Sequence, residues 1–154
     1  MATRIVPLLL VYLSVWTLSL VRGDEGCKPE VECSAQSGDQ LTVKYNLQPI
    51  SCGSAQNKND VSSAPEVFYS GGSPGDSNGK LKSAGQGDLM AYAGPTPPAN
   101  TGYHRYQFLL YDLPDQASIS GVPTSRGQFN LADFLSTNQL SDNRVAEFEF
   151  KTQH

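Results

Sequence analysis

Several residue types are scarce in this chain of 154 residues. It holds three cysteines, two histidines and one tryptophan, and its 11 basic residues are outnumbered by 15 acidic ones. An acidic domain without a basic run is a poor candidate for binding nucleic acid or for general adhesion to anionic membranes, although a local cationic pocket stays open. Because Cys-x-x-Cys is missing and no histidine lies near the cysteines, we expect no metal site and no cofactor.

Motifs for catalysis are equally sparse. A hydrolase would need a nucleophile beside a histidine and a carboxylate that orients it. Asp112 and Asp133 could supply the carboxylate, but the chain has no Gly-x-Ser-x-Gly elbow or reactive-cysteine context, and His154 is terminal. We therefore expect no catalytic residues and no enzymatic activity. The Asn-x-Ser/Thr sequon is also absent, so N-glycosylation is not expected.

The N-terminus has the three-part pattern of a secretory signal peptide. Residues 1–23 hold Arg4, then an apolar run, and end with Val21 and Gly23, which are small enough for a signal-peptidase site. The alternative is a signal anchor that stays in the membrane, but the apolar run is just below the length of a comfortable transmembrane helix. Cleavage would leave residues 24–154 with nine basic and fifteen acidic residues, a formal charge of −6. We expect a secreted, extracellular product with no further membrane segment.

All three cysteines lie close to the expected mature N-terminus. Residues 24–40 form an irregular lead-in that contains Cys27 and Cys33, and Cys52 follows shortly after. In an oxidising compartment two of the three are expected to form a disulfide, and the third is left over. The sequence leaves all three pairings open.

Alternating apolar residues predict a mainly β domain over residues 41–154. In the strongest strand, His104, Tyr106, Phe108 and Leu110 share one face, and apolar residues on the other face indicate that the strand is covered on both sides. A short helix is expected at "NLADFLS", where Asn130 is an N-cap residue. The predicted strands are 40–45, 64–70, 103–111 and 144–152.

The predicted domain is interrupted by a stretch of unusual composition. Residues 70–87 are mostly Gly, Ser, Asn, Asp and Lys, and they supply no apolar face that could be buried. A compact domain rarely contains so long a loop. We therefore interpret this stretch as a Gly/Ser-rich junction.

The segment "YAGPTPPANTGYHRYQFLLY", residues 92–111, resembles the phosphatidylethanolamine-binding protein family. A Pro-Pro turn followed by Gly-x-His-Arg-Tyr is a specific combination at this spacing. Further similarity is found in "LTVKY", "SSAPEVFYSGGSPG", "RGQFNLADFL" and "VAEFEF", and the leader and N-terminal cysteines are similar to the secreted, fourth-type branch. The resemblance implies a β-sandwich with one or two short helices.

Part of the family's pattern is missing from this chain. The family's Asp-Pro-Asp-x-Pro strand end and the following His-Trp strand have no counterpart between "GGSPGDSNGK" and "LMAYAGP". The chain also stops soon after "EFEF", without the family's C-terminal helix. The resemblance therefore implies a sandwich shortened by a central deletion, with the acidic half of the ligand pocket absent.

The resemblance also assigns candidate ligand-binding residues. Pro97 and Pro98 correspond to the Pro-Pro wall of the family's anion pocket, and His104 and Tyr106 to its strand residues. These two project from one face, so an imidazole and a phenol could both bond one oxyanion. Thr96 replaces the glycine that the family has before the two prolines, which narrows the approach of a ligand. The alternative is an ordinary strand histidine beside a core tyrosine.

Two classes of partner follow from these residues. The family's pocket binds phosphate-bearing small molecules or phospholipid head groups, and a weakened form of this binding is the first expectation. The alternative is an extracellular protein-interaction or regulatory module, inhibitor-like or signalling, that binds a protein and no ligand.

Overall fold

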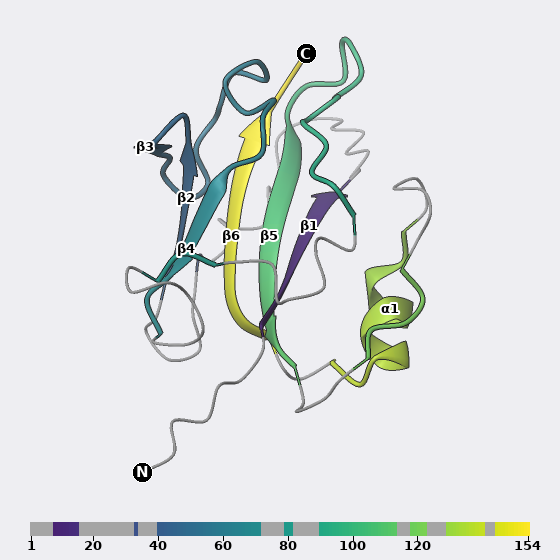
Figure 1. Cartoon of the computed structure of the whole chain (residues 1–154). Helices are drawn as coiled ribbons and strands as arrows, with labels where there is room; N and C mark the ends of the chain where they lie inside the picture. The colour runs from purple at the N-terminus through teal and green to yellow at the C-terminus, as the bar shows by residue number, and fades with distance from the viewer. Residues whose placement is uncertain are drawn as a thin grey trace.

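Two antiparallel sheets of three strands each make up most of this computed structural model (Figure 1). One sheet has the order β3-β2-β4, and the other has the order β1-β5-β6. The described residues are 8–15 (backbone only), 33, 40–71, 79–81, 90–113, 118–122, 129–140 and 144–154. The elements are β1 (Leu8–Val15), β2 (Leu41–Tyr45), β3 (Gln48–Pro49), β4 (Glu66–Tyr69), β5 (His104–Asp112), α1 (Leu131–Thr137) and β6 (Arg144–Thr152).

The smaller sheet follows the predicted alternation. Leu41, Val43 and Tyr45 of β2 are buried, whereas the residues between them are only half-buried. β4 pairs with β2 in antiparallel register and turns Val67 and Tyr69 to the same buried face. These strands form where the sequence predicts them because a period of two places one apolar face against the core.

The main core lies between the two sheets. β5 and β6 are antiparallel neighbours, and alternate residues of each face β2 and β4 (Figure 1). The buried members of this core are Leu41, Val43, Tyr45, Val61, Val67, Tyr69, Tyr106, Phe108, Leu110, Ala146, Phe148 and Phe150.

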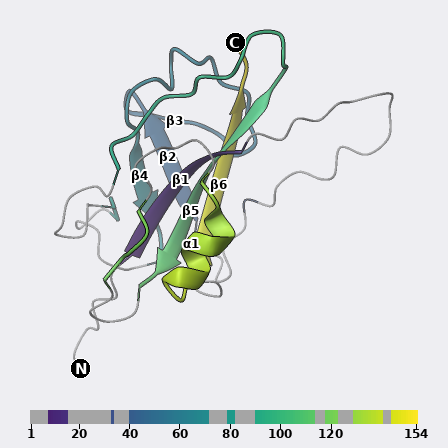
Figure 2. The same cartoon turned by 90° about the vertical axis from the view of Figure 1, so that its right-hand side faces the viewer.

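A second, smaller core covers the opposite face of β5. It consists of Leu109, Tyr111, Leu113 and Leu140, and the helix α1 packs against it (Figure 2). The prediction that β5 is buried on both faces is therefore confirmed. Apolar residues are found on both faces of a strand when other helices or sheets cover both faces.

The helix begins as the sequence predicts. The side chain of Asn130 accepts a hydrogen bond from the backbone N–H of Asp133, which confirms Asn130 as the N-cap. Phe134 is buried against Phe129, with ring centres 5.4 Å apart, and Leu135 packs on the smaller core. The cap satisfies one of the backbone donors that a helix start leaves without an intrahelical partner.

Residues 8–15 form a strand within the stretch that the sequence predicts to be a signal peptide. β1 pairs antiparallel with β5 from Leu8 opposite Asp112 to Val15 opposite Arg105. Among the residues that the structure describes, no helix is long and apolar enough to cross a membrane.

A few residues of the Gly/Ser-rich junction attach to the smaller sheet. The backbone N–H of Leu81 donates to Val67, and that of Tyr69 donates to Gly79. Leu81 also packs against the main core. The expected linker is thus tied to β4 over residues 79–81, and the rest of the junction lies outside the described residues apart from Ser70 and Gly71.

A candidate anion-binding wall at the start of β5

A turn leads the chain from the Pro-Pro dipeptide into β5. Pro97 is buried and Pro98 is half-buried, and both precede Asn100 and Gly102, which have φ angles of 62° and 75°. Glycine adopts positive φ without steric cost, so Gly102 lets the chain reverse sharply. The turn places both prolines at the His104 end of β5.

His104 is almost fully buried at this end of the sheet, with 7% of its surface exposed. Its Nε2 lies 2.6 Å from the hydroxyl oxygen of Thr101, and that hydroxyl is 2.8 Å from the carbonyl oxygen of Pro98. Because the Thr101 hydroxyl donates to the carbonyl, the imidazole Nε2–H donates to Thr101. Sequence reasoning missed Thr101, although its place in the turn three residues before His104 is a usable signal.

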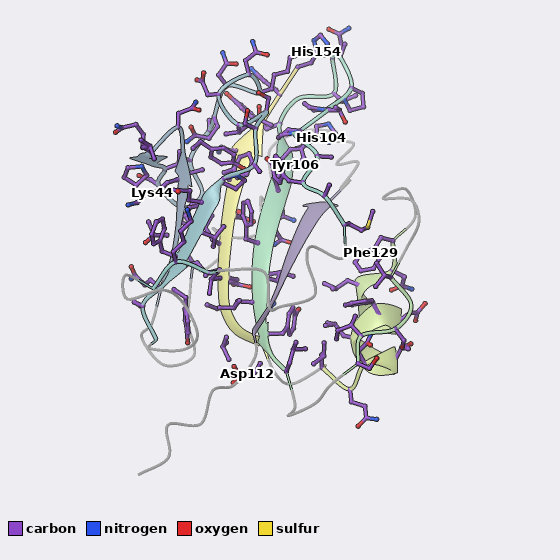
Figure 3. The ribbon with its side chains drawn as sticks, in the orientation of Figure 1. Lys44, His104, Tyr106, Asp112, Phe129 and His154 are labelled. Carbon is purple, nitrogen blue, oxygen red and sulfur yellow. A yellow bond between two sulfur atoms is a disulfide. The ribbon has the colours of Figure 1, made fainter. Side chains whose placement is uncertain are left out.

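Tyr106 points from the same face of β5 as His104 (Figure 3). Its ring stacks on Phe150 with centres 5.4 Å apart, so it is a member of the main core. Burial raises the pKa of the Tyr106 hydroxyl, and a hydrogen bond with the backbone of Thr96 partly offsets this rise. The phenol therefore stays protonated, as a neutral donor or acceptor.

A hydrogen-bonded pair of tyrosines lies within the same core. The Tyr92 hydroxyl donates to the carbonyl oxygen of Val61 over 2.8 Å, and the Tyr45 hydroxyl lies 2.8 Å from that of Tyr92. Tyr45 is therefore the donor in this second bond. Burial, followed by the bond to Tyr92, raises the pKa of Tyr45 far above its ordinary value.

Replacing Tyr92 by phenylalanine is expected to cost about 1–3 kcal/mol of unfolding free energy, because a buried carbonyl and the Tyr45 hydroxyl both lose a partner. Tyr45→Phe is the matched control. It leaves the bond from Tyr92 to Val61 in place and should cost only about 0.5–1.5 kcal/mol. The shift of the urea unfolding midpoint in each variant, at an unchanged m-value, would give the two losses of unfolding free energy. Equal losses in the two variants would contradict this hydrogen-bond order.

Stability is also expected to fall at alkaline pH. The fold holds Tyr45 protonated, whereas the unfolded chain releases this proton near the ordinary pKa of 10.0. The stabilisation is therefore complete below pH 10 and declines above it, by up to about 1.4 kcal/mol per pH unit for this one group. Urea unfolding between about pH 8 and about pH 11 should show a shallower decline in Tyr45→Phe than in the parent chain. If the unfolding free energy of the two proteins fell equally steeply with pH, Tyr45 would have the same pKa in the folded and the unfolded chain.

The polar groups of the wall are already bonded within the protein. His104 contacts Thr101, and Tyr106 contacts the backbone of Thr96. The structure thus brings His104, Tyr106 and the turn with both prolines together at one end of the sheet. It also places Tyr106 in the core, which is the alternative that sequence reasoning left open.

A cavity of about 250 Å³ lies elsewhere, at the start of β2. Cys33 and Cys52 line it, and these two cysteines form a disulfide with Cα atoms 6.2 Å apart. The structure thus selects one of the three pairings that the sequence leaves open. Cys27 lies outside the described residues.

A buried carboxylate, Glu149, lies on the face of the sheet away from His104. Burial raises the pKa of Glu149, and the charge of Arg105 and a hydrogen bond from Gln107 partly offset that rise. Arg105 therefore acts as a charge partner within the fold, in line with its position on the opposite face of β5. The sequence of β6 does not reveal this burial. Glu147 lies two residues before Glu149, on the same face of the strand, and is only half-buried.

The two carboxylates considered for catalysis lie away from His104. Asp112 ends β5, and the rise of a strand places it about 26 Å from His104. The two residues lie at opposite ends of the strand (Figure 3). Asp133 is in the first turn of α1, where it bonds Asn130. Neither of them orients the imidazole.

Comparison with known proteins gives one family. The family model described as phosphatidylethanolamine-binding protein matches residues 36–149, which is more than half of the chain. UPF0098 protein Mb1945c of Mycobacterium bovis is 44% identical over 52 residues, which are 34% of this chain and 24% of that protein. Protein SELF-PRUNING of Solanum lycopersicum is 36% identical over 61 residues, 40% of this chain and 34% of that protein. These matches thus span only 24% and 34% of the two relatives' own length.

Solved structures agree on the fold. A phosphatidylethanolamine-binding protein from Plasmodium vivax superposes with a TM-score of 0.58 at 14% identity, covering 75% of this chain and 85% of that one. A carboxypeptidase Y inhibitor, complexed with its cognate proteinase, superposes with a TM-score of 0.56 at 19% identity, covering 73% and 82%. The expected mainly β fold of this type, with a short helix, is therefore confirmed.

Proposed function

Because the chain belongs to the phosphatidylethanolamine-binding protein family, we propose that it is a secreted, non-enzymatic binding protein that takes a phosphate-bearing ligand, weakly, at the His104 end of β5. The observation that carries this proposal is the bond between His104 Nε2 and the Thr101 hydroxyl beside the Pro97–Pro98 turn. Export of the protein is the expectation from residues 1–23.

The chemistry of this bond suits a phosphate oxygen. An imidazole N–H and a threonine hydroxyl are both hydrogen-bond donors, and they lie 2.6 Å apart. An anion at this point would accept from both, replacing the mutual contact and the bond from Thr101 to Pro98. Hydrogen bonds to a charged acceptor are shorter and stronger than neutral ones, so this exchange is favourable for an anion.

The same contacts explain why weak binding is proposed. His104 and Tyr106 are 7% and 4% exposed, and both already have partners inside the protein. A ligand has to displace these bonds, and each lost internal bond subtracts from the affinity. We therefore expect a dissociation constant in the millimolar range, about −4 kcal/mol.

The direction of the Thr101 hydroxyl favours binding over catalysis. A threonine nucleophile needs a base that accepts its proton. Thr101 donates its proton to the Pro98 carbonyl, and His104 donates to Thr101, so the imidazole is not placed to accept it. Asp112 and Asp133 lie away from the pair, as described above.

A thermal-melt titration with phosphoethanolamine tests the proposal. A ligand that binds only the folded state stabilises it, and at ten times the dissociation constant the gain is about 1.4 kcal/mol. We expect an upward shift in the parent chain and none in Thr101→Val, which removes one donor from an exposed turn residue. Ethanolamine without phosphate is the matched ligand control.

The chain offers a matched histidine pair as a second control. His104→Gln should abolish the shift, whereas His154→Gln, at the exposed C-terminus, should retain it. Each variant is compared with its own ligand-free melt, so a loss of stability does not obscure the result. A parent melt that does not change up to about 10 mM phosphoethanolamine would refute the ligand proposal.

Two exposed side chains support a second candidate, an extracellular protein-interaction module. Tyr103 precedes His104 and is 53% exposed, and Leu47 is 74% exposed in the turn between β2 and β3. Tyrosine is among the side chains that are enriched at the energetic centres of protein interfaces, so Tyr103 is the stronger anchor of the two. The carboxypeptidase Y inhibitor shares this fold and forms a complex with its proteinase. A folded chain that ignores phosphoethanolamine would favour this candidate.

A further inference from the structure

The edge of β5 that β1 covers accepts a complete additional strand. β1 pairs with β5 over eight consecutive residues, from Arg105 to Asp112, without a break in register. No other strand in the described part of the chain lies on this side of β5, since the sheet order is β1-β5-β6. Removal of residues 1–23, expected from the leader pattern, would therefore leave this edge open.

The central residues of β5 lack the features that protect natural edge strands. Such strands commonly carry lysine, proline or inward charges that prevent pairing with another chain. The central residues 106–111, "YQFLLY", contain no charge and no proline, and five of the six are buried. The opposite edge of the sheet is partly covered, because Gly53 and Ser54 exchange backbone hydrogen bonds with β6. The edge of β5 that removal of β1 uncovers is therefore the edge of this sheet that is available for pairing with another strand.

We propose that, once residues 1–23 are removed, two copies of this chain associate through β5, each strand taking the place of β1 in the other copy. The product is a continuous antiparallel sheet with the order β6-β5-β5-β6. The proposal depends on removal of the leader and requires no ligand at His104.

The sequence of β5 is self-complementary in one register. If Phe108 lies opposite its own copy at a two-fold axis, all nine residues from His104 to Asp112 are paired. Residues directly opposite then have the same parity, so the core face of one sheet continues into the core face of the other. In this register Tyr106 lies opposite Leu110. His104 lies opposite Asp112 at each end of the joined strands, so a basic side chain faces an acidic one there.

The position of α1 is compatible with this arrangement. The helix packs on Leu109, Tyr111 and Leu113, that is, on the Asp112 half of β5. His104 and Asp112 mark opposite ends of β5, and α1 lies beside the Asp112 end (Figure 3). An antiparallel pair therefore places the two helices at opposite ends of the joined sheet.

The test uses the product that cells secrete from the full gene. Mass spectrometry identifies its N-terminus, and light scattering after gel filtration gives its mass. We expect cleavage after Gly23, a dimer, and a melting temperature that rises with protein concentration, because association stabilises the folded state by mass action. The dimer should convert to a monomer when a lysine-flanked peptide of residues 8–15, "LLLVYLSV", occupies the edge of β5, and a scrambled peptide should have no effect.

A cross-link reports the register. In a Cys27→Ser background, Gln107→Cys would place two thiols on Cα atoms roughly 8 Å apart across the axis, within reach of a short bismaleimide. Gln153→Cys, exposed after β6 on the far side of the sheet, is the matched control and should not cross-link. A dimer that cross-links through Gln153 and not Gln107 would overturn the proposal.

Three further results would also overturn it. One is a folded, cleaved product that stays monomeric at about 100 µM. Another is a secreted product that retains residues 1–23. The third is a cleaved product that is unfolded at every concentration, since the proposal requires folding to appear as the dimer forms.

Discussion

Replacing Phe150 by alanine is expected to lower the unfolding free energy by about 3–5 kcal/mol. Phe150 has no exposed surface and lies at the centre of the aromatic core. Its ring stacks on Tyr106 at 5.4 Å, meets Tyr45 edge-on at 5.9 Å and lies 6.3 Å from Phe108. Truncation removes these contacts and leaves a cavity that rigid neighbouring strands cannot close, so the loss is a large part of the total stability of a domain.

Phe68→Ala is the matched control for Phe150→Ala. Phe68 is in β4, is only half-buried and has the Lys44 Nζ atom 4.4 Å from its ring centre. Its truncation should cost no more than about half as much, because less apolar area is removed from water. Urea unfolding of both variants measures the difference. Equal losses would show that the two sheets do not share one core around Phe150.

Removing the disulfide between Cys33 and Cys52 is expected to cost about 3 kcal/mol. The bridge closes a loop with a sequence separation of 19 residues. Without it the unfolded chain gains conformations, and residue 33 is no longer tied to the segment that follows β3. The double variant Cys33→Ser, Cys52→Ser, measured by urea unfolding with a reducing agent present, gives this value.

Cys27→Ser is the matched control for the disulfide. It leaves the bridge intact and should change stability by less than about 0.5 kcal/mol. Peptide mapping of the secreted chain under non-reducing conditions checks the pairing itself. A bridge from Cys27 to Cys33 or Cys52, or a large loss in Cys27→Ser, would contradict the pairing described here.

Local patterns in the sequence were sufficient for most of the elements. The alternation in "LTVKY" and "RVAEFEFKT" predicts β2 and β6 because each strand buries one face. Asn130 marks the start of α1 through a bond to a residue three positions away, and Gly102 marks the turn before β5. These features depend on contacts within a few residues, so a short window of sequence contains the information.

Long-range contacts decided the rest. Nothing local distinguishes Cys27 from Cys33 as the partner of Cys52, or predicts that the apolar residues 8–15 form a strand, since such a run suits a leader, a helix or a strand equally. Tyr106 and Glu149 are buried because other elements pack over them, whereas the bond between Thr101 and His104 spans only three residues and is a local feature. By itself the sequence determined the periodicities, the cap, the turn and the family motif, and the tertiary structure decided the cysteine pairing, the strand beside β5 and the burial of Tyr106 and Glu149. The physical reason is that pairing and burial depend on residues far apart in the chain, whose proximity only the packed sheets establish.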